Sequence, residues 1–219
     1  HYVKALKVDP DNTHLHFYLA RAYEAQRKTD QAIQQYEKTL ELDGDHAGAH
    51  LNLGALLGQK RQLDQSVHHF REALRIQPDY ALAHYNLARA LQSQGQLDEA
   101  MPHYQLAVDL DPDDARAHYR CAQALVVKGQ AEEALAHYRQ ALKLRPDWTA
   151  VLSELAWCLA ARPDWPVHAP EEALALADEI VGTIRQWVDR DVMPNAAEFE
   201  HSDTFPQAMF EQMCEFGLF

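Results

Sequence analysis

The sequence predicts an all-α protein, built as a right-handed superhelical α-solenoid of antiparallel helix pairs with two extra helices at the C-terminal end. Three observations lead to this prediction. The chain repeats with a period of 34 residues, marked by Pro78, Pro112 and Pro146. Apolar residues within a period follow the spacing of two helices. Glycine is scarce, with 8 in 219 residues, whereas residues that lose little entropy in a helix are abundant.

The period sets the expected order of the elements. Residues 1–12 match the second half of a repeat, because His1–Pro10 aligns with His137–Pro146. Complete repeats follow at 13–46, 47–80, 81–114 and 115–148. An atypical fifth repeat spans 149–181, because its proline-rich segment 162–170 is too long for the usual turn. Residues 1–181 are therefore predicted to form one array.

The third repeat shows how the helix pair is specified. Leu87 and Leu91 lie on one face of the first helix, and Ala100 and Tyr104 lie on one face of the second. Gly95 between them supplies a left-handed residue that ends the first helix. Small residues stand where helices approach closely, and an aromatic residue fills the gap to the next repeat.

These small and large positions resemble those of the tetratricopeptide repeat. Counted from the first residue of each complete repeat, position eight holds Ala20, Gly54, Ala88 and Ala122, and position twenty holds Ala32, Ser66, Ala100 and Ala134. The resemblance implies a concave groove, lined mainly by the first helix of each pair, in which an extended peptide binds. It implies a scaffold for a protein or peptide partner.

Polar groove residues follow from the same resemblance. Asn52 and Asn86 occupy position six, where members of the family use asparagine amides to hold the backbone of a bound peptide. Arg116 and Arg120, together with Asn86, resemble the carboxylate clamp of chaperone-binding relatives. The alternative for both arginines is solvation or pairing with neighbouring acids such as Asp113 and Asp114.

An aromatic series at position five is predicted to face the same groove. It contains Phe17, Tyr85 and Tyr119, with Leu51 in the second repeat. Such a stripe either anchors apolar side chains of a peptide or packs between adjacent first helices. The spacing of these residues does not separate the two interpretations.

Histidine recurs at position four, as His16, His50, His84 and His118. Equivalent helices lie about 10 Å apart, whereas zinc requires nitrogen ligands at about 2 Å. One histidine per repeat therefore cannot converge on an ion. We expect packing or surface roles for these residues, and no metal site.

Composition narrows the function further. The chain has 20 basic and 33 acidic residues, a net charge of −13 that disfavours nucleic acid as a partner. No apolar run approaches the roughly 18 residues of a membrane span. Cys121, Cys158 and Cys214 are far apart, as expected for free thiols in the cytoplasm. No motif for catalysis or phosphate binding is present, so we expect no enzyme activity and no cofactor.

Residues 182–219 depart from the repeat. Ile184, Trp187 and Val188 form an apolar stripe that Pro194 ends, and a second helix follows Pro206. The pattern I-R-x-x-V, then F-P, then G-L-F resembles the start of the acyl-CoA dehydrogenase N-terminal domain.

Two interpretations of this tail stay open. It is either the first helices of an amputated fusion to an FAD-dependent acyl-CoA dehydrogenase, or a helical cap on the array. In that enzyme family the flavin, acyl-CoA and catalytic residues all lie beyond this segment. A third possibility is that the repeats regulate an attached catalytic domain.

Overall fold

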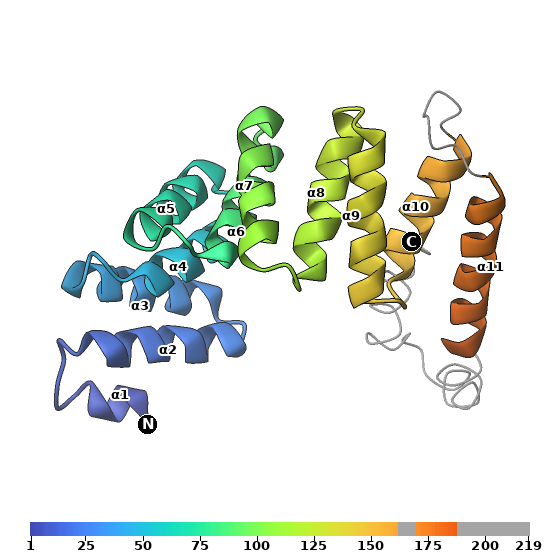
Figure 1. The fold of residues 1–219 in the computed structure, drawn as a ribbon. Coiled ribbons are helices and arrows are strands. Elements are labelled where there is room, and N and C mark those ends of the chain that lie inside the picture. The colour runs from blue at the N-terminus through green and yellow to red at the C-terminus, as the bar shows by residue number, and fades with distance from the viewer. Residues whose placement is uncertain (162–169, 188–219) are drawn as a thin grey trace, which may run out of the picture. The chain divides into compact units, whose positions relative to one another are not determined.

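The computed structural model describes residues 1–161 and 170–187, and within these residues it contains eleven helices and no strand (Figure 1). The predicted all-α fold is confirmed. Residues 162–169 of the proline-rich segment and the tail from 188 onward, including the predicted second tail helix, lie outside the described residues. The chain divides into two compact units, residues 1–112 and 113–219, each of which is described by itself.

The first unit is a stack of helix pairs. Its helices are α1 (Tyr2–Ala5), α2 (Thr13–Ala25), α3 (Thr29–Leu42), α4 (Ala47–Gln59), α5 (Leu63–Ile76), α6 (Ala81–Ser93) and α7 (Leu97–Leu110). Within each pair, α2 packs on α3, α4 on α5 and α6 on α7, while α3 contacts α4 and α5 contacts α6 (Figure 1). Each pair therefore shields the apolar face of its neighbour, as the 34-residue period predicts.

The second unit repeats the arrangement. Its described helices are α8 (Ala115–Val127), α9 (Ala131–Leu144), α10 (Thr149–Ala161) and α11 (Pro170–Trp187). The pairs are α8 with α9 and α10 with α11, and α9 contacts α10. Helix α11 begins at Pro170, the last residue of the predicted insertion, and continues through residues 181 and 182. The sequence-based division between array and tail therefore falls inside a helix.

The turns within each pair share one backbone conformation. Gly95 and Gly129 have φ of 80° and 74°, which confirms that they supply left-handed residues. The same place in the first two repeats holds Arg27 and Arg61, with φ of 58° and 63°. A residue with a Cβ is strained in this region, so the register of the repeat is imposed on both arginines.

Small side chains allow the helices of a pair to approach closely. In the first, third and fourth repeats, alanines at positions eight and twenty are fully buried; they are Ala20, Ala32, Ala88, Ala100, Ala122 and Ala134. The second repeat uses Gly54 and Ser66 instead, and the Ser66 hydroxyl donates to the Gly54 carbonyl at 2.7 Å. A Cβ on Gly54 would lie 2.9 Å from the ring of Phe70. The expected alternation of small and large residues is confirmed.

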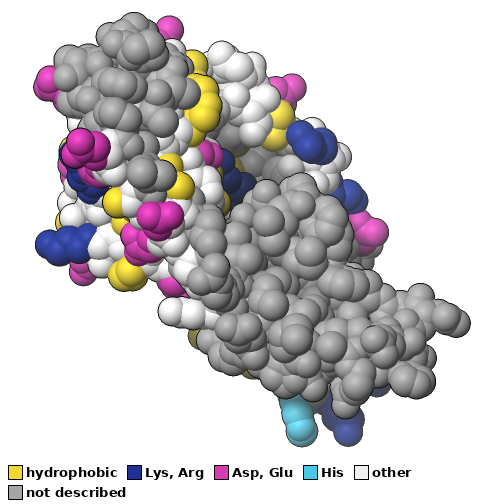
Figure 2. Space-filling model, turned by 90° about the vertical axis from the view of Figure 1, so that its right-hand side faces the viewer, with side chains coloured by type: hydrophobic (Ala, Val, Ile, Leu, Met, Phe, Trp, Pro, Cys, Tyr) yellow, Lys and Arg dark blue, Asp and Glu magenta, His cyan; other side chains and the backbone are white. Residues whose placement is uncertain are grey.

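The surface carries mixed charge. Figure 2 shows acidic and basic side chains interspersed over the described part of one face, with neither sign gathered into a continuous patch. Of the helices that the structure describes, none is both long enough and apolar enough to cross a membrane.

Candidate functional site

Equivalent positions in successive repeats form junctions between neighbouring first helices. Each junction combines position 12 of one first helix, position 24 of the second helix that follows, and position six of the next first helix. The closed junction consists of Glu24, Tyr36 and Asn52, on α2, α3 and α4. The open junction, 34 residues further on, consists of Gly58, Phe70 and Asn86, on α4, α5 and α6.

A tyrosine hydroxyl fills the closed junction. The hydroxyl of Tyr36 donates to Oε2 of Glu24 at 2.8 Å, and Nδ2 of Asn52 donates to the same hydroxyl at 3.1 Å. The Tyr36 side chain is fully buried. Burial, together with the neighbouring Glu24 carboxylate, raises the pKa of Tyr36 well above its ordinary value, so the hydroxyl keeps its proton. The amide of Asn52 is therefore already bonded within the protein.

The open junction lacks both partners of that hydrogen bond. Phe70 has no hydroxyl and Gly58 has no side chain, so a hollow of about 200 Å³ lies between α4 and α6. Its lining residues are Ala55, Gly58, Gln59, Leu63, Ser66, Phe70, Asn86, Arg89, Ala90 and Ser93. Asn86 is half-buried, and its amide makes no hydrogen bond with any described residue. An uncommitted donor and acceptor thus line the hollow.

Arg89 contributes a positive charge to this hollow. Its guanidinium carbon lies 5.6 Å from the ring centroid of Tyr85, a cation–π contact, and the guanidinium forms no ion pair with a described residue. On α5, the carboxylate of Asp64, next in sequence to the lining residue Leu63, accepts from the amide of Gln94 at 2.6 Å. Tyr85 itself is only 7% exposed. Tyr85 therefore packs between helices and supports Arg89.

The second unit contains a junction closed by different chemistry. The carboxylate of Glu154, at position six on α10, accepts from the hydroxyl of Tyr138 at 2.7 Å and from that of Tyr119 at 2.8 Å. Nε2 of Gln123 donates to the same carboxylate at 2.8 Å. Burial and Glu154 raise the pKa of both tyrosines far above the ordinary value. No amide is left free here.

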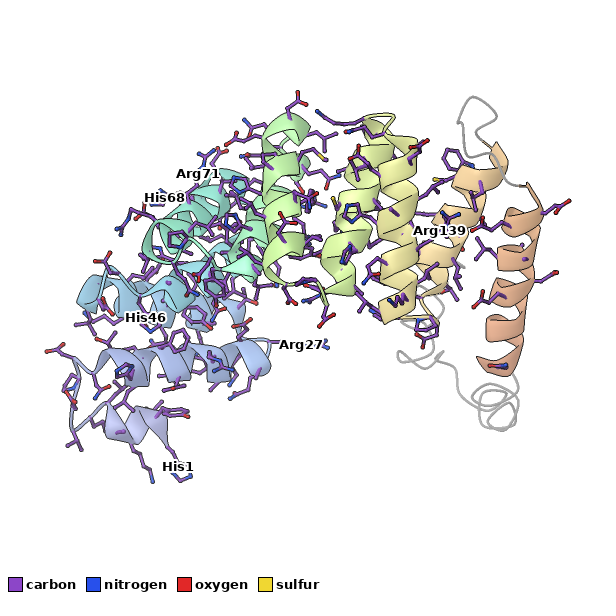
Figure 3. The ribbon with its side chains drawn as sticks, in the orientation of Figure 1. His1, Arg27, His46, His68, Arg71 and Arg139 are labelled. Carbon is purple, nitrogen blue, oxygen red and sulfur yellow. The ribbon has the colours of Figure 1, made fainter. Side chains whose placement is uncertain are left out.

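The other predicted groove residues are engaged within the protein. Arg116 donates through Nε and Nη2 to the carboxylate of Asp114, both at 3.0 Å, and Nη1 of Arg120 donates to Gln123 at 2.8 Å. The ring of Phe17 lies 4.5 Å from that of His46, which stands at the start of α4 (Figure 3). Of the seven predicted residues, Asn86 is the one whose polar side-chain atoms are unbonded among the described residues.

The position-four histidines are buried and belong to pairs. Nδ1 of His50 lies 3.0 Å from Nδ1 of His69 on the second helix of the same repeat. The equivalent pairs are His84 with His103 at 2.9 Å and His118 with His137 at 3.0 Å, and His16 contacts Gln35 at 2.8 Å. The sequence analysis predicted the packing role of these histidines but missed the histidine that each contacts. The sequence does carry a signal for this contact, because a second histidine recurs at position 23 with the same period.

Hydrogen bonding fixes the tautomers of the pair. Nε2 of His50 lies 3.1 Å from the Gly44 carbonyl, which only accepts, so Nε2 carries the proton and Nδ1 accepts from His69. Burial, and then the neighbouring His50 and His68, lower the pKa of His69 to about 4. Residues 1–161 and 170–187 contain no group of three or more side chains placed to hold a metal.

Comparison with known proteins identifies the family. Models described as tetratricopeptide repeat match residues 1–34, 19–61, 51–115 and 91–153. The chain therefore belongs to the tetratricopeptide repeat family. No curated protein sequence matches it significantly.

Solved structures share the fold at low sequence identity. YrrB, described as a tetratricopeptide repeat protein with an unusual peptide-binding site, is 22% identical, with a TM-score of 0.69 over 90% of this chain and 97% of that one. MamA from Desulfovibrio magneticus RS-1 is 18% identical, with a TM-score of 0.68 over 82% and 97%. Pseudomonas aeruginosa pilF is 16% identical, with a TM-score of 0.72 over 91% and 86%. These likenesses support an α-solenoid of helix pairs.

Proposed function

We propose that the protein is a non-catalytic scaffold that holds an extended peptide of a partner protein across α4 and α6, at the open junction. The observation that carries the proposal is the unbonded amide of Asn86 beside a hollow of about 200 Å³. In the preceding repeat a tyrosine hydroxyl occupies the equivalent place and bonds the equivalent asparagine. The open junction therefore offers to a ligand what the closed junction uses internally.

The chemistry of an amide suits a peptide backbone. Asn86 can donate to a backbone carbonyl and accept from the N–H of the same residue, which holds a chain without reading its sequence. Asn52 would first have to release the hydroxyl of Tyr36, at a cost typical of a lost hydrogen bond. We therefore assign the leading role to Asn86. YrrB, which is described as having a peptide-binding site, offers a parallel on the same fold.

The other predicted contacts have secondary roles in this proposal. Tyr85 places Arg89 at the hollow rather than contacting the peptide itself. Phe17, Tyr119, Arg116 and Arg120 already make intramolecular contacts, so a partner that used them would replace those contacts. Binding through these residues is expected to be weaker than binding at the open junction.

Replacing one asparagine at a time tests the proposal. Peptides are selected from a phage-displayed library of random nonapeptides on the wild-type chain and then synthesised for affinity measurement by fluorescence polarisation. Asn86→Ala should raise the Kd about tenfold, because the two backbone hydrogen bonds together contribute about 1.4 kcal/mol. Asn52→Ala, the matched control, should leave the Kd within about twofold. Equal losses in both variants, or a loss in Asn52→Ala alone, would contradict the assignment.

A further inference from the structure

We propose that the open junction selects peptides in which an internal acidic side chain adjoins a compact apolar side chain. This inference rests on the proposed function and adds the chemical class of the ligand. Two features of the hollow carry it: the apolar side chains that line it where Gly58 has no side chain, and the guanidinium of Arg89 in the same lining.

The floor of the hollow suits one apolar side chain. The half-buried side chains of Leu63 and Ala55 line the hollow together with Phe70 and Ala90, which are 3% and 6% exposed. The hydroxyl of Ser66 is already bonded to the Gly54 carbonyl, so it does not require a polar ligand group. A volume of about 200 Å³ is large enough to admit one aliphatic side chain. A valine, leucine or methionine of the ligand that enters the hollow would remove its own apolar surface, and that of Leu63 and Ala55, from water.

The charge at the hollow favours a carboxylate. Among the ten lining residues Arg89 is the only charged one, and none is acidic, although the chain as a whole has a net charge of −13. The contact with the Tyr85 ring holds the guanidinium while leaving its N–H groups unbonded to described residues. An arginine fork meets a carboxylate with two parallel hydrogen bonds, which gives both strength and direction.

The order of the groups along α6 explains why the carboxylate comes from a side chain. Asn86 and Arg89 are three residues apart on one helix, so their side chains project from the same face. When Asn86 bonds the N–H and C=O of one peptide residue, the side chains of the neighbouring residues lie within reach of Arg89 and of the hollow. An internal Asp or Glu beside an apolar residue satisfies all three contacts.

The selected peptides and a charge reversal provide the test. The nonapeptides are displayed through their C-termini, so that they carry no free terminal carboxylate. We expect the enriched sequences to contain Asp or Glu next to Val, Leu, Ile or Met. Arg89→Glu should weaken these peptides at least about tenfold and should turn the preference toward versions in which Lys replaces the acid. Phe70→Tyr should also weaken the binding of these peptides, because the new hydroxyl would fill the hollow and hydrogen-bond the amide of Asn86.

Controls separate this inference from the proposed function. Arg27→Glu makes the same charge change at the α2–α3 turn (Figure 3), and it should leave affinity unchanged within about twofold. Thermal melts establish that each variant is folded. Enriched peptides that lack an acid, or that bind Arg89→Glu equally well, would overturn the inference while leaving the scaffold function intact. So would peptides that bind only as synthetic versions with a free C-terminus. Failure to enrich any peptide would overturn both proposals.

Discussion

The closed and open junctions occupy the same place in successive repeats and differ mainly in the side chains at two positions. At the closed junction, the side chains of Glu24, Tyr36 and Asn52 are hydrogen-bonded to one another. Where Phe70 and Gly58 stand, a hollow remains and an asparagine amide is unbonded. Because a repeat fold fixes the backbone around each junction, removing one hydroxyl and its acceptor converts a structural position into a candidate binding position without altering the helices.

The second unit shows a third version of the same position. Glu154 stands where the first unit has asparagine, and its carboxylate accepts from Tyr138, Tyr119 and Gln123. A single acceptor thus replaces the bridge that Glu24 and Asn52 form around Tyr36. The comparison predicts that closed junctions contribute to stability and that the open junction contributes to binding, and the following experiments separate the two contributions.

The largest effect is expected on breaking the junction in the second unit. Glu154→Ala leaves the hydroxyls of Tyr138 and Tyr119 without their acceptor, whereas the Gln123 amide keeps the Tyr119 hydroxyl as a partner at 2.9 Å. Each unsatisfied hydroxyl costs about 1 to 3 kcal/mol. We expect a loss of about 3 kcal/mol in the free energy of unfolding, measured by urea denaturation. Glu154→Gln keeps one acceptor oxygen and should lose roughly half as much. A loss below about 1 kcal/mol for Glu154→Ala would show that water replaces the carboxylate.

The second largest effect is expected in the pH dependence of stability, and it comes from the histidine pairs. The pKa of His69 is about 4 in the folded protein, below its ordinary value of 6.5, so the unfolded chain binds more protons between these values. Stability should therefore fall as the pH drops from about 6.5 toward 4. Each pKa unit corresponds to about 1.4 kcal/mol in the free energy of unfolding. Because the His69 ring is partly exposed to solvent, screening reduces the full value, and we expect a loss of about 2 kcal/mol.

The first repeat supplies the control for this pH dependence. There Gln35 takes the place of the second histidine at 2.8 Å from His16, so His69→Gln keeps a hydrogen-bonding partner for His50 while removing a titrating group. Urea denaturation at pH 7 and pH 5 should show a smaller loss in His69→Gln than in the wild type. Glu72 and Arg75 lie near the pair in both proteins, so their contributions cancel in the comparison. An equal loss in both proteins would show that His69 does not cause the pH dependence and would assign it to other groups, such as His103 or the carboxylates.

Exchanging the hydroxyl between the two junctions tests the comparison directly. Tyr36→Phe removes the bridge to Glu24 and Asn52 and should destabilise the protein by about 1 kcal/mol, while releasing Asn52 for a ligand. Phe70→Tyr should leave stability within about 0.5 kcal/mol, because Asn86 becomes its partner, and should weaken peptide binding. Thermal melts and fluorescence polarisation measure the two effects. Stronger binding by Phe70→Tyr would refute the role given to the open junction.

The sequence predicted the fold more completely than the site. Periodicity identified the helix pairs and the left-handed turns at Gly95 and Gly129, because backbone conformation and packing follow local patterns. It did not distinguish Asn52 from Asn86, which are identical in type and position. The difference depends on contacts with Tyr36 and Phe70, residues of another helix. Comparing positions 12 and 24 across the period would have revealed it, as would the second histidine at position 23 for the buried pairs.

The smallest predicted effect concerns the turns that join the helices of each pair. Arg27 and Arg61 hold the left-handed conformation that Gly95 and Gly129 hold in the later repeats, and no atoms lie within 4 Å of a Cβ built on either glycine. Arg61→Gly should therefore stabilise the protein by about 0.5 to 1 kcal/mol, and Gly95→Arg should destabilise it by a similar amount, through backbone strain alone. Thermal denaturation of the two variants measures both signs. A destabilising Arg61→Gly would contradict this prediction, because the entropy that glycine adds to the unfolded chain would then exceed the strain relieved.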